Sequence, residues 1–136
     1  MGILRRLLAW VRRDDNFDAF EISFDGDIAI VTALAAPDFE ETMRLIDYLS
    51  QNNIYKRRLW DFSQIDFPYD LHEIREFAAY GRAQMRAKNR FAVLVNDDIG
   101  FGSMRAFSVY RQEKGVTDVL VSRDRDEAIT WLSEDF

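Results

Sequence analysis

Arg90–Asn96, with the sequence RFAVLVN, is an apolar run that is followed by a helical pattern. A second, shorter run, Val119–Ser122, leads through a charged stretch into the helical pattern EAITWL of residues 127–132. Strand-like and helix-like segments therefore alternate, and this alternation predicts a parallel sheet covered by helices. This part of the chain indicates an architecture, but it contains no recognisable catalytic motif.

A hairpin is predicted near the start of the chain. Residues 17–24 alternate in polarity, with Phe20, Ile22 and Phe24 on one side, as in a half-buried strand. Asp25-Gly26-Asp27 supplies the glycine that a tight turn needs. Residues 28–34 are apolar on both faces, which predicts a returning strand in the interior of the sheet.

Helix signals fill the spaces between the strands. Pro37 and Asp38 begin one helix that closes at residues 51–53, and a second helix extends from Asp70 to about Arg86. Asp70 with Glu73, and later Asp124 with Glu127, have capping-box spacing. Residues 97–102 are expected to form a turn, in which two glycines mark a special backbone, before a helix that extends to about residue 114. The expected inward positions of these helices are Phe39, Met43, Ile46, Tyr48 or Leu49, Leu71, Ile74, Phe77, Ala78, Met85, Met104, Phe107, Ser108, Ala128, Ile129 and Leu132.

With a third strand at residues 58–62, the pattern predicts one α/β domain over residues 17–136. We expect a mixed, mostly parallel five-stranded sheet that starts with an antiparallel hairpin and is covered by about four helices. A chain of 136 residues suits one domain and can bury a core of its own.

Residues 1–14 form a separate element in this interpretation. Apolar side chains at helical spacing predict an amphipathic helix whose other face carries four arginines. This helix is a candidate for contact with a membrane surface or a partner groove, and docking on its own domain or on a second copy is the alternative. The apolar face consists of Ile3, Leu4, Leu7, Leu8 and Val11.

Composition excludes several classes of function. The net charge of −6 disfavours general binding to nucleic acid, which depends on neutralising phosphates. The chain has no cysteine, which excludes disulfides and thiolate chemistry and is consistent with a reducing, cytoplasmic location. No stretch approaches 18 apolar residues, so no membrane span is expected, and the N-terminus is a poor secretory signal.

The order β-β-α-β-α-β-α-β-α resembles that of the anti-sigma-factor-antagonist (STAS) domain, in particular its divergent STAS-like bacterial branch, which is also compared with the CRAL-TRIO lipid-binding domain. The resemblance is carried by Phe91–Asp98 (FAVLVNDD), by Phe101–Phe107 (FGSMRAF) and by Asp124–Leu132 (DRDEAITWL). It covers roughly residues 17–135. It implies a regulatory protein that acts by contact with other proteins.

Classical members of that family are regulated by phosphorylation of a serine that follows the third strand. In this sequence Asp70 stands at the corresponding position, so the phosphoswitch serine is absent. A fixed carboxylate there could imitate a phosphorylated residue, or it could simply cap the helix that follows.

Ligands of open α/β sheets bind outside the carboxyl ends of the strands. The candidate residues for a ligand or partner rim at that edge are Asp61, Ser63, Asp70, Asp97, Asp98, Gly102, Arg105 and Arg123. Asp97 and Asp98 could bind a hard cation or share a proton, but we favour a turn that caps a helix, because two adjacent aspartates offer too few oxygen ligands.

Two further groups of side chains have competing interpretations. The basic groups at residues 56–58 and 82–90 could meet an acidic partner or a lipid head group, or could lie at solvated helix ends, which we favour. His72, the only histidine, has no nucleophile at motif spacing and is expected at the surface.

Three functions follow in order of preference. The first is a non-enzymatic STAS-like regulatory or protein-interaction module of the bacterial cytoplasm, with a protein partner or self-association. The second is a binder of a lipid or another small apolar ligand, which the aromatic richness favours. The third, an enzyme, requires Asp61, Asp97 or Asp98 to converge with Arg105 or Arg123 in a cleft. No cofactor, metal or nucleic acid is expected, and membrane contact is at most peripheral, through residues 1–14.

Overall fold

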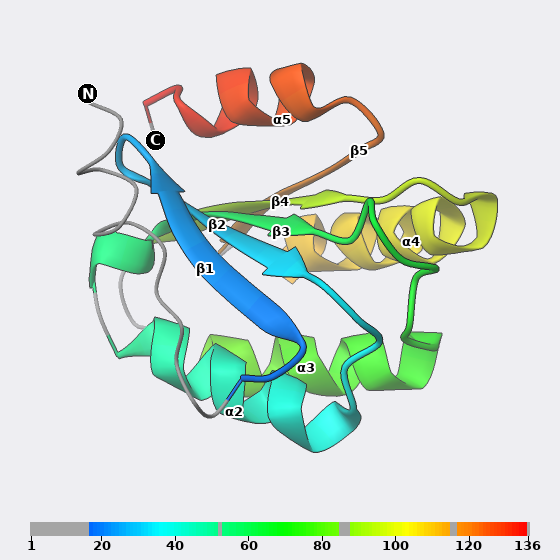
Figure 1. The fold of residues 1–136 in the computed structure, drawn as a ribbon. Helices are drawn as coiled ribbons and strands as arrows, with labels where there is room; N and C mark the ends of the chain where they lie inside the picture. Colours follow the sequence, from blue (N-terminus) through cyan, green and yellow to red (C-terminus); the bar gives the residue numbers. More distant parts are fainter. Residues whose placement is uncertain (1–16, 52, 85–87, 115–116, 136) are drawn as a thin grey trace.

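The computed structural model describes residues 17–51, 53–84, 88–114 and 117–135 (Figure 1). They form an α/β fold around a five-stranded sheet of order β1-β2-β3-β4-β5. β1 and β2 are antiparallel, and every later pair is parallel. The strands are β1 (Phe20–Asp25), β2 (Ile28–Ala33), β3 (Arg57–Asp61), β4 (Asn89–Leu94) and β5 (Thr117–Ser122). The helices are α2 (Phe39–Ser50), the short 3-10 helix η1 (Asn53–Tyr55), α3 (Leu71–Gln84), α4 (Asp98–Lys114) and α5 (Arg125–Leu132).

The helices cover the two faces of the sheet unequally. In Figure 1, α2, α3 and α4 lie on one face and α5 alone lies on the other. Connections between parallel strands are right-handed with few exceptions. A sheet that adds each new strand on the same side of the last one therefore receives its connecting helices on one face. α5 follows β5 and does not link two of the described strands, so this rule does not assign it to that face, and it covers the opposite one.

The sheet separates two apolar clusters. The larger lies under α2, α3 and α4 and contains Phe20, Ile22 and Val93, whereas the smaller lies under α5 and contains Leu59 and Leu132. Side chains alternate between the two faces along each strand. This period-two pattern confirms the expected inward side of the first strand, since Phe20, Ile22 and Phe24 all belong to the larger cluster.

Local signals form as expected at two helix caps and one turn. Gly26 has a φ of 63°, as the hairpin turn requires. Asp70 and Glu73 form a reciprocal capping box, in which the Glu73 N–H donates to Asp70 Oδ1 at 2.8 Å and the Asp70 N–H donates to Glu73 Oε1 at 3.1 Å. Asp124 caps α5 as expected. Asp38 is the N-cap of α2, so Pro37 precedes the helix and does not lie in its first turn as expected. Glu127, however, pairs with the Ser122 hydroxyl, so only half of the second capping box forms.

The expected turn at residues 97–102 is wrong. α4 begins at Asp98, and Gly100 and Gly102 lie inside its first two turns without a positive φ. Gly100 is required by close packing instead, because a Cβ atom there would lie 2.6 Å from the Cβ of Phe67. Asp97, which precedes the helix, accepts a hydrogen bond from the Gly100 N–H at 2.6 Å and so acts as the cap.

Other expectations differ by small shifts. The inner face of α2 is centred on Thr42, Leu45 and Leu49, one position away from the expected Met43 and Ile46, which are only half-buried. Strand ends differ by one to three residues, the largest shift being the start of β1 at Phe20, and α3 ends at Gln84. Residues 1–14, expected to be an amphipathic helix, lie outside the described residues, as does Met85, and nothing is described of the Phe107 side chain.

Candidate functional site

The rim at the carboxyl ends of the strands is a network of internal contacts. Asp61, at the end of β3, is buried and pairs with Arg125 Nη1 at 2.9 Å. Its other oxygen accepts hydrogen bonds from the backbone N–H of Ser63 at 2.9 Å and from the Ser63 hydroxyl at 2.6 Å. These contacts hold the start of α5 and the loop after β3 to the end of the sheet.

Asp97, which follows β4, also connects a loop to the start of a helix through hydrogen bonds. Its carboxylate accepts the Phe67 N–H at 2.9 Å and the Gly100 N–H at 2.6 Å, so it ties the loop before α3 to the start of α4. The hydrogen bonds from Phe67 and Gly100, and the charge of Arg123, stabilise the ionised form and lower the pKa of Asp97.

Asp98 and Arg123 form an ion pair at the surface, and Arg105 and Arg123 both contact the Phe101 ring. Arg123 Nη2 lies 2.6 Å from Asp98 Oδ1, and both side chains are exposed. The guanidinium carbons of Arg123 and Arg105 lie 4.7 and 5.7 Å from the centre of the Phe101 ring. Ile99, on the same helix turn, is 81% exposed.

The remaining candidates stand apart from these groups. Asp70 caps α3, and Gly102 is exposed on α4 with nothing within 4 Å of a Cβ atom built there. His72 is exposed and lies 4.0 Å from Glu76. No group of three or more His, Cys, Asp or Glu residues could hold a metal ion within the described parts of the chain. The rim therefore holds loops and helix ends together, and of the expected acids and arginines it pairs Asp98 with Arg123.

A pocket among the described residues lies elsewhere, between the sheet and its three-helix layer. A cavity of about 100 Å³ extends from the amino-terminal to the carboxyl-terminal edge of β3 and β4, under α2 and α3 and beside α4. The described residues that line it include no carboxylate and no imidazole. They are Thr42, Ile46, Ser50, Arg58, Trp60, Phe62, Phe67, Tyr69, Ile74, Phe77, Ala78, Gly81, Asn89, Phe91, Val93 and Met104.

Aromatic rings form most of the wall at the carboxyl-terminal edge. Phe62 packs edge-on against Phe67 and Tyr69 at centroid distances of 5.4 and 5.6 Å, and Trp60 stacks on Phe62 at 6.4 Å. Tyr69 and Thr42 share a hydrogen bond of 2.7 Å between their hydroxyls. Burial raises the pKa of the Tyr69 hydroxyl, so this group stays neutral and satisfied at that end of the cavity.

The opposite end is basic. Arg58, only 8% exposed, lines the cavity at the start of β3, and its Nη2 donates to Asn89 Oδ1 at 3.1 Å. The Arg58 guanidinium carbon also lies 5.4 Å from the centre of the Phe91 ring. One buried cation therefore stands at one end of a largely apolar space.

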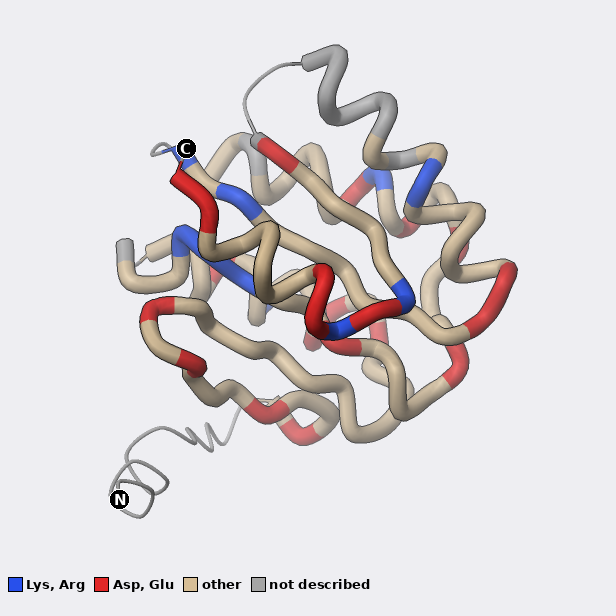
Figure 2. Tube along the Cα trace, turned by 90° about the horizontal axis from the view of Figure 1, so that it is seen from above, with Lys and Arg blue, Asp and Glu red and all other residues tan. Residues whose placement is uncertain are grey.

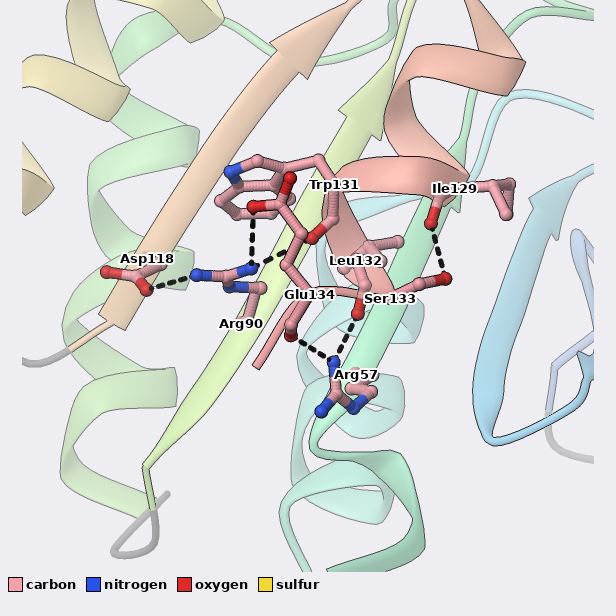
Figure 3. A network of polar contacts seen from close by, with 8 residues as sticks. All are labelled: Arg57, Arg90, Asp118, Ile129, Trp131, Leu132, Ser133 and Glu134. Atoms are coloured by element: carbon pink, nitrogen blue, oxygen red, sulfur yellow. Dashed lines mark hydrogen bonds and ion pairs between the residues drawn. The ribbon is translucent and has the colours of Figure 1, made fainter. Parts of the chain in front are cut away.

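The neighbouring arginines lie on the other face of the sheet (Figure 3). Arg57 donates to the carbonyls of Leu132 and Glu134, the latter at 2.8 Å, and Arg90 donates to that of Trp131 at 2.8 Å. Arg90 also lies 4.3 Å above the Trp131 ring. These two arginines hold the end of α5. Figure 2 shows the resulting charge pattern, with acidic segments at the start of α5 and basic ones near its end.

We expected the basic residues at 56–58 and at 90 to lie at solvated helix ends. For three of these four residues the expectation is wrong. Arg58 and Arg90 are buried and Arg57 is half-buried, because each lies at the start of a strand under a helix layer. A signal was present in the sequence. In RRLWDF (57–62) the period of two places Arg58 on the same face as Trp60 and Phe62, and therefore in the core.

No family model, curated protein or solved structure matches the chain. The fold and the cavity define the class of protein as a mixed α/β domain with an apolar pocket between its sheet and one helix layer, and the likeness to the STAS family stays a prediction. Within the described residues, no helix is both long and apolar enough to cross a lipid bilayer.

Proposed function

We propose that this protein is a non-enzymatic binding module that holds a small, mostly apolar ligand in the cavity between α2, α3 and the sheet. The carrying observation is the lining of that cavity, which is aromatic and aliphatic along its length and polar only at its ends. Binding pockets for small molecules are typically concave, mainly apolar and supplied with a few polar groups that orient the ligand.

The size of the space limits the ligand. A volume of about 100 Å³ is of the same order as engineered apolar cavities of ~150 Å³, which bind benzene or xenon. A single ring or a short chain therefore fits first. The absence of carboxylates and imidazoles from the described lining supports binding without general acid–base chemistry.

The proposal can be tested with a substitution that fills the cavity. Ala78 on α3 lines the cavity, whereas Ala79, the next residue, is exposed. We expect Ala78→Leu to abolish the binding of benzene and xenon, measured by NMR titration, and Ala79→Leu to bind like the unmodified chain. Trp60 lies in the wall, so its fluorescence should respond to benzene in the same variants.

Native mass spectrometry of freshly purified protein provides an independent reading, since a co-purifying mass lost in Ala78→Leu would identify the natural ligand. If neither probe binds and no mass co-purifies, the proposal is wrong. Equal binding by both leucine variants would place the probes elsewhere on the molecule.

A second candidate is the regulatory or protein-interaction module of the bacterial cytoplasm that the STAS-like resemblance implies. The specific observation in its favour is Ile99, 81% exposed beside the surface cluster of Asp98, Phe101, Arg105 and Arg123. An exposed apolar side chain bordered by arginines is a common composition for an interface centre.

Pull-down from the native host distinguishes this candidate. Ile99→Asp should lose a partner that the unmodified chain retains, while Ile54→Asp, at a 56% exposed isoleucine on η1, should keep it. The partner should then bind the purified protein with the same dependence on Ile99. Retention by both variants would exclude this surface.

A further inference from the structure

Arg58 makes the two ends of the cavity chemically different. It lies at the amino-terminal edge of β3, where Ser50, at the end of α2, and Asn89, at the start of β4, complete that end of the space. The rest of the described lining is apolar apart from Thr42 and Tyr69, whose hydroxyls bond to each other at the far end. A ligand that spans the cavity therefore meets a guanidinium at one end and rings along its length.

The energetics favour an anion at the Arg58 end. A buried guanidinium loses much of its hydration, and a negatively charged group placed beside it recovers part of that loss in surroundings where charges interact strongly. Guanidinium groups bind carboxylates through paired N–H donors, and such charge-assisted hydrogen bonds are about twice as strong as neutral ones. No described residue in the lining would repel a negative charge.

We infer that the ligand is a small amphipathic carboxylate, with its carboxylate at Arg58 and Asn89 and its apolar part between Trp60, Phe77 and Phe91. This inference rests on the proposed function and names the ligand class for the same cavity. It differs from the proposed function in requiring a charge on the ligand, which the probes benzene and xenon lack.

The experiment compares matched acids and alcohols by calorimetric titration: benzoate with benzyl alcohol, hexanoate with hexanol, and decanoate with decanol. We expect at least one acid to bind ~10-fold or more tightly than its alcohol, as removal of a charge-assisted hydrogen bond predicts. The preference should weaken at high salt less than that of an exposed pair, because the site is buried.

Two variants assign the preference to Arg58. Arg58→Met removes the charge and keeps most of the side-chain length, and it should bring acid and alcohol to equal affinity. Arg57→Met removes the same charge from the adjacent residue, whose side chain lies on the opposite face, and should keep the acid preference. Circular dichroism checks that both variants are folded, and the comparison of ligands on the unmodified chain stands even if one is not.

The outcomes separate the two proposals. Binding of the alcohols as tightly as the acids, or an acid preference that survives Arg58→Met, overturns the carboxylate inference and leaves the apolar cavity as the binding site. If no acid, no alcohol and no benzene binds, the proposed function fails and this inference fails with it.

Discussion

Gly100 lies so close to the loop before α3 that its missing side chain is a structural requirement. A Cβ atom there would lie 2.6 Å from the Cβ of Phe67 and 2.8 Å from Asp97 Oδ1. Gly102, two residues later in the same helix, has nothing within 4 Å of the equivalent position. The two glycines of one helix therefore have different physical roles.

We expect Gly100→Ala to lower the free energy of unfolding by about 1–3 kcal/mol, because overpacking outweighs the better helix propensity of alanine. Gly102→Ala is the matched control and should raise it by up to about 1 kcal/mol. Urea unfolding followed by circular dichroism measures both. Equal effects of the two substitutions would contradict the close packing at Gly100.

Asp97 should make the stability depend on pH. Its pKa is lowered in the folded state by the hydrogen bonds from Phe67 and Gly100, so its ionised form stabilises the fold above the unfolded pKa. This contribution is lost as the pH falls through the lowered folded pKa. Asp97→Asn should therefore be less stable near neutral pH, and the difference should shrink at low pH.

Urea unfolding of the unmodified chain and Asp97→Asn from pH 7 downward tests this sign. Asp66→Asn, at an exposed position in the same loop, is the control and should follow the unmodified chain. A stability difference that grows on acidification would contradict the assignment.

At the scale of elements, α5 is held by side chains from the strands that it covers. Arg57 and Arg90 donate to carbonyls at the end of the helix, where a positive charge also favours the helix dipole. The Arg90 guanidinium additionally stacks on Trp131 and lies 3.1 Å from Asp118 (Figure 3). These contacts fix α5 to its face of the sheet.

Arg90→Met should destabilise the protein by about 1.5–3 kcal/mol, the range for hydrogen bonds to charged groups. Arg90→Lys should recover only part of that loss, because an ammonium lacks the planar fork and the stacking surface. Hydrogen exchange of the α5 amides should accelerate in both variants. The exposed Arg75 on α3 supplies the control, and a loss of similar size in Arg75→Met would show that charge alone is responsible.

At the scale of the whole molecule, the sheet divides the structure into a thin side under α5 and a thicker side with the cavity. Any molecule that binds the folded cavity stabilises the whole domain by mass action. Benzene at about one hundred times its dissociation constant should raise the free energy of unfolding by about 2.7 kcal/mol. This rise in thermal stability should be absent in Ala78→Leu and present in Ala79→Leu, as differential scanning calorimetry can measure.

Filling the space should also change the stability of the free protein. Leucine at position 78 would fill part of the pocket of about 100 Å³ and gain apolar contacts with its walls. We therefore expect Ala78→Leu to lie within about 1 kcal/mol of the unmodified chain or above it. A loss of several kcal/mol would indicate that the walls are too tightly packed for this volume to be open.

The element order, the hairpin, the mixed sheet and the helix caps at Asp70 and Asp124 could be predicted from the sequence, because they depend on periodicity and on interactions within a few residues. Tertiary structure decided which face each helix covers, that Gly100 packs against Phe67, and that the rim acids are paired with arginines and loop amides. Such features depend on contacts between residues 25 to 75 positions apart, from Asp98 with Arg123 to Arg57 with Leu132, and no local pattern encodes their distances.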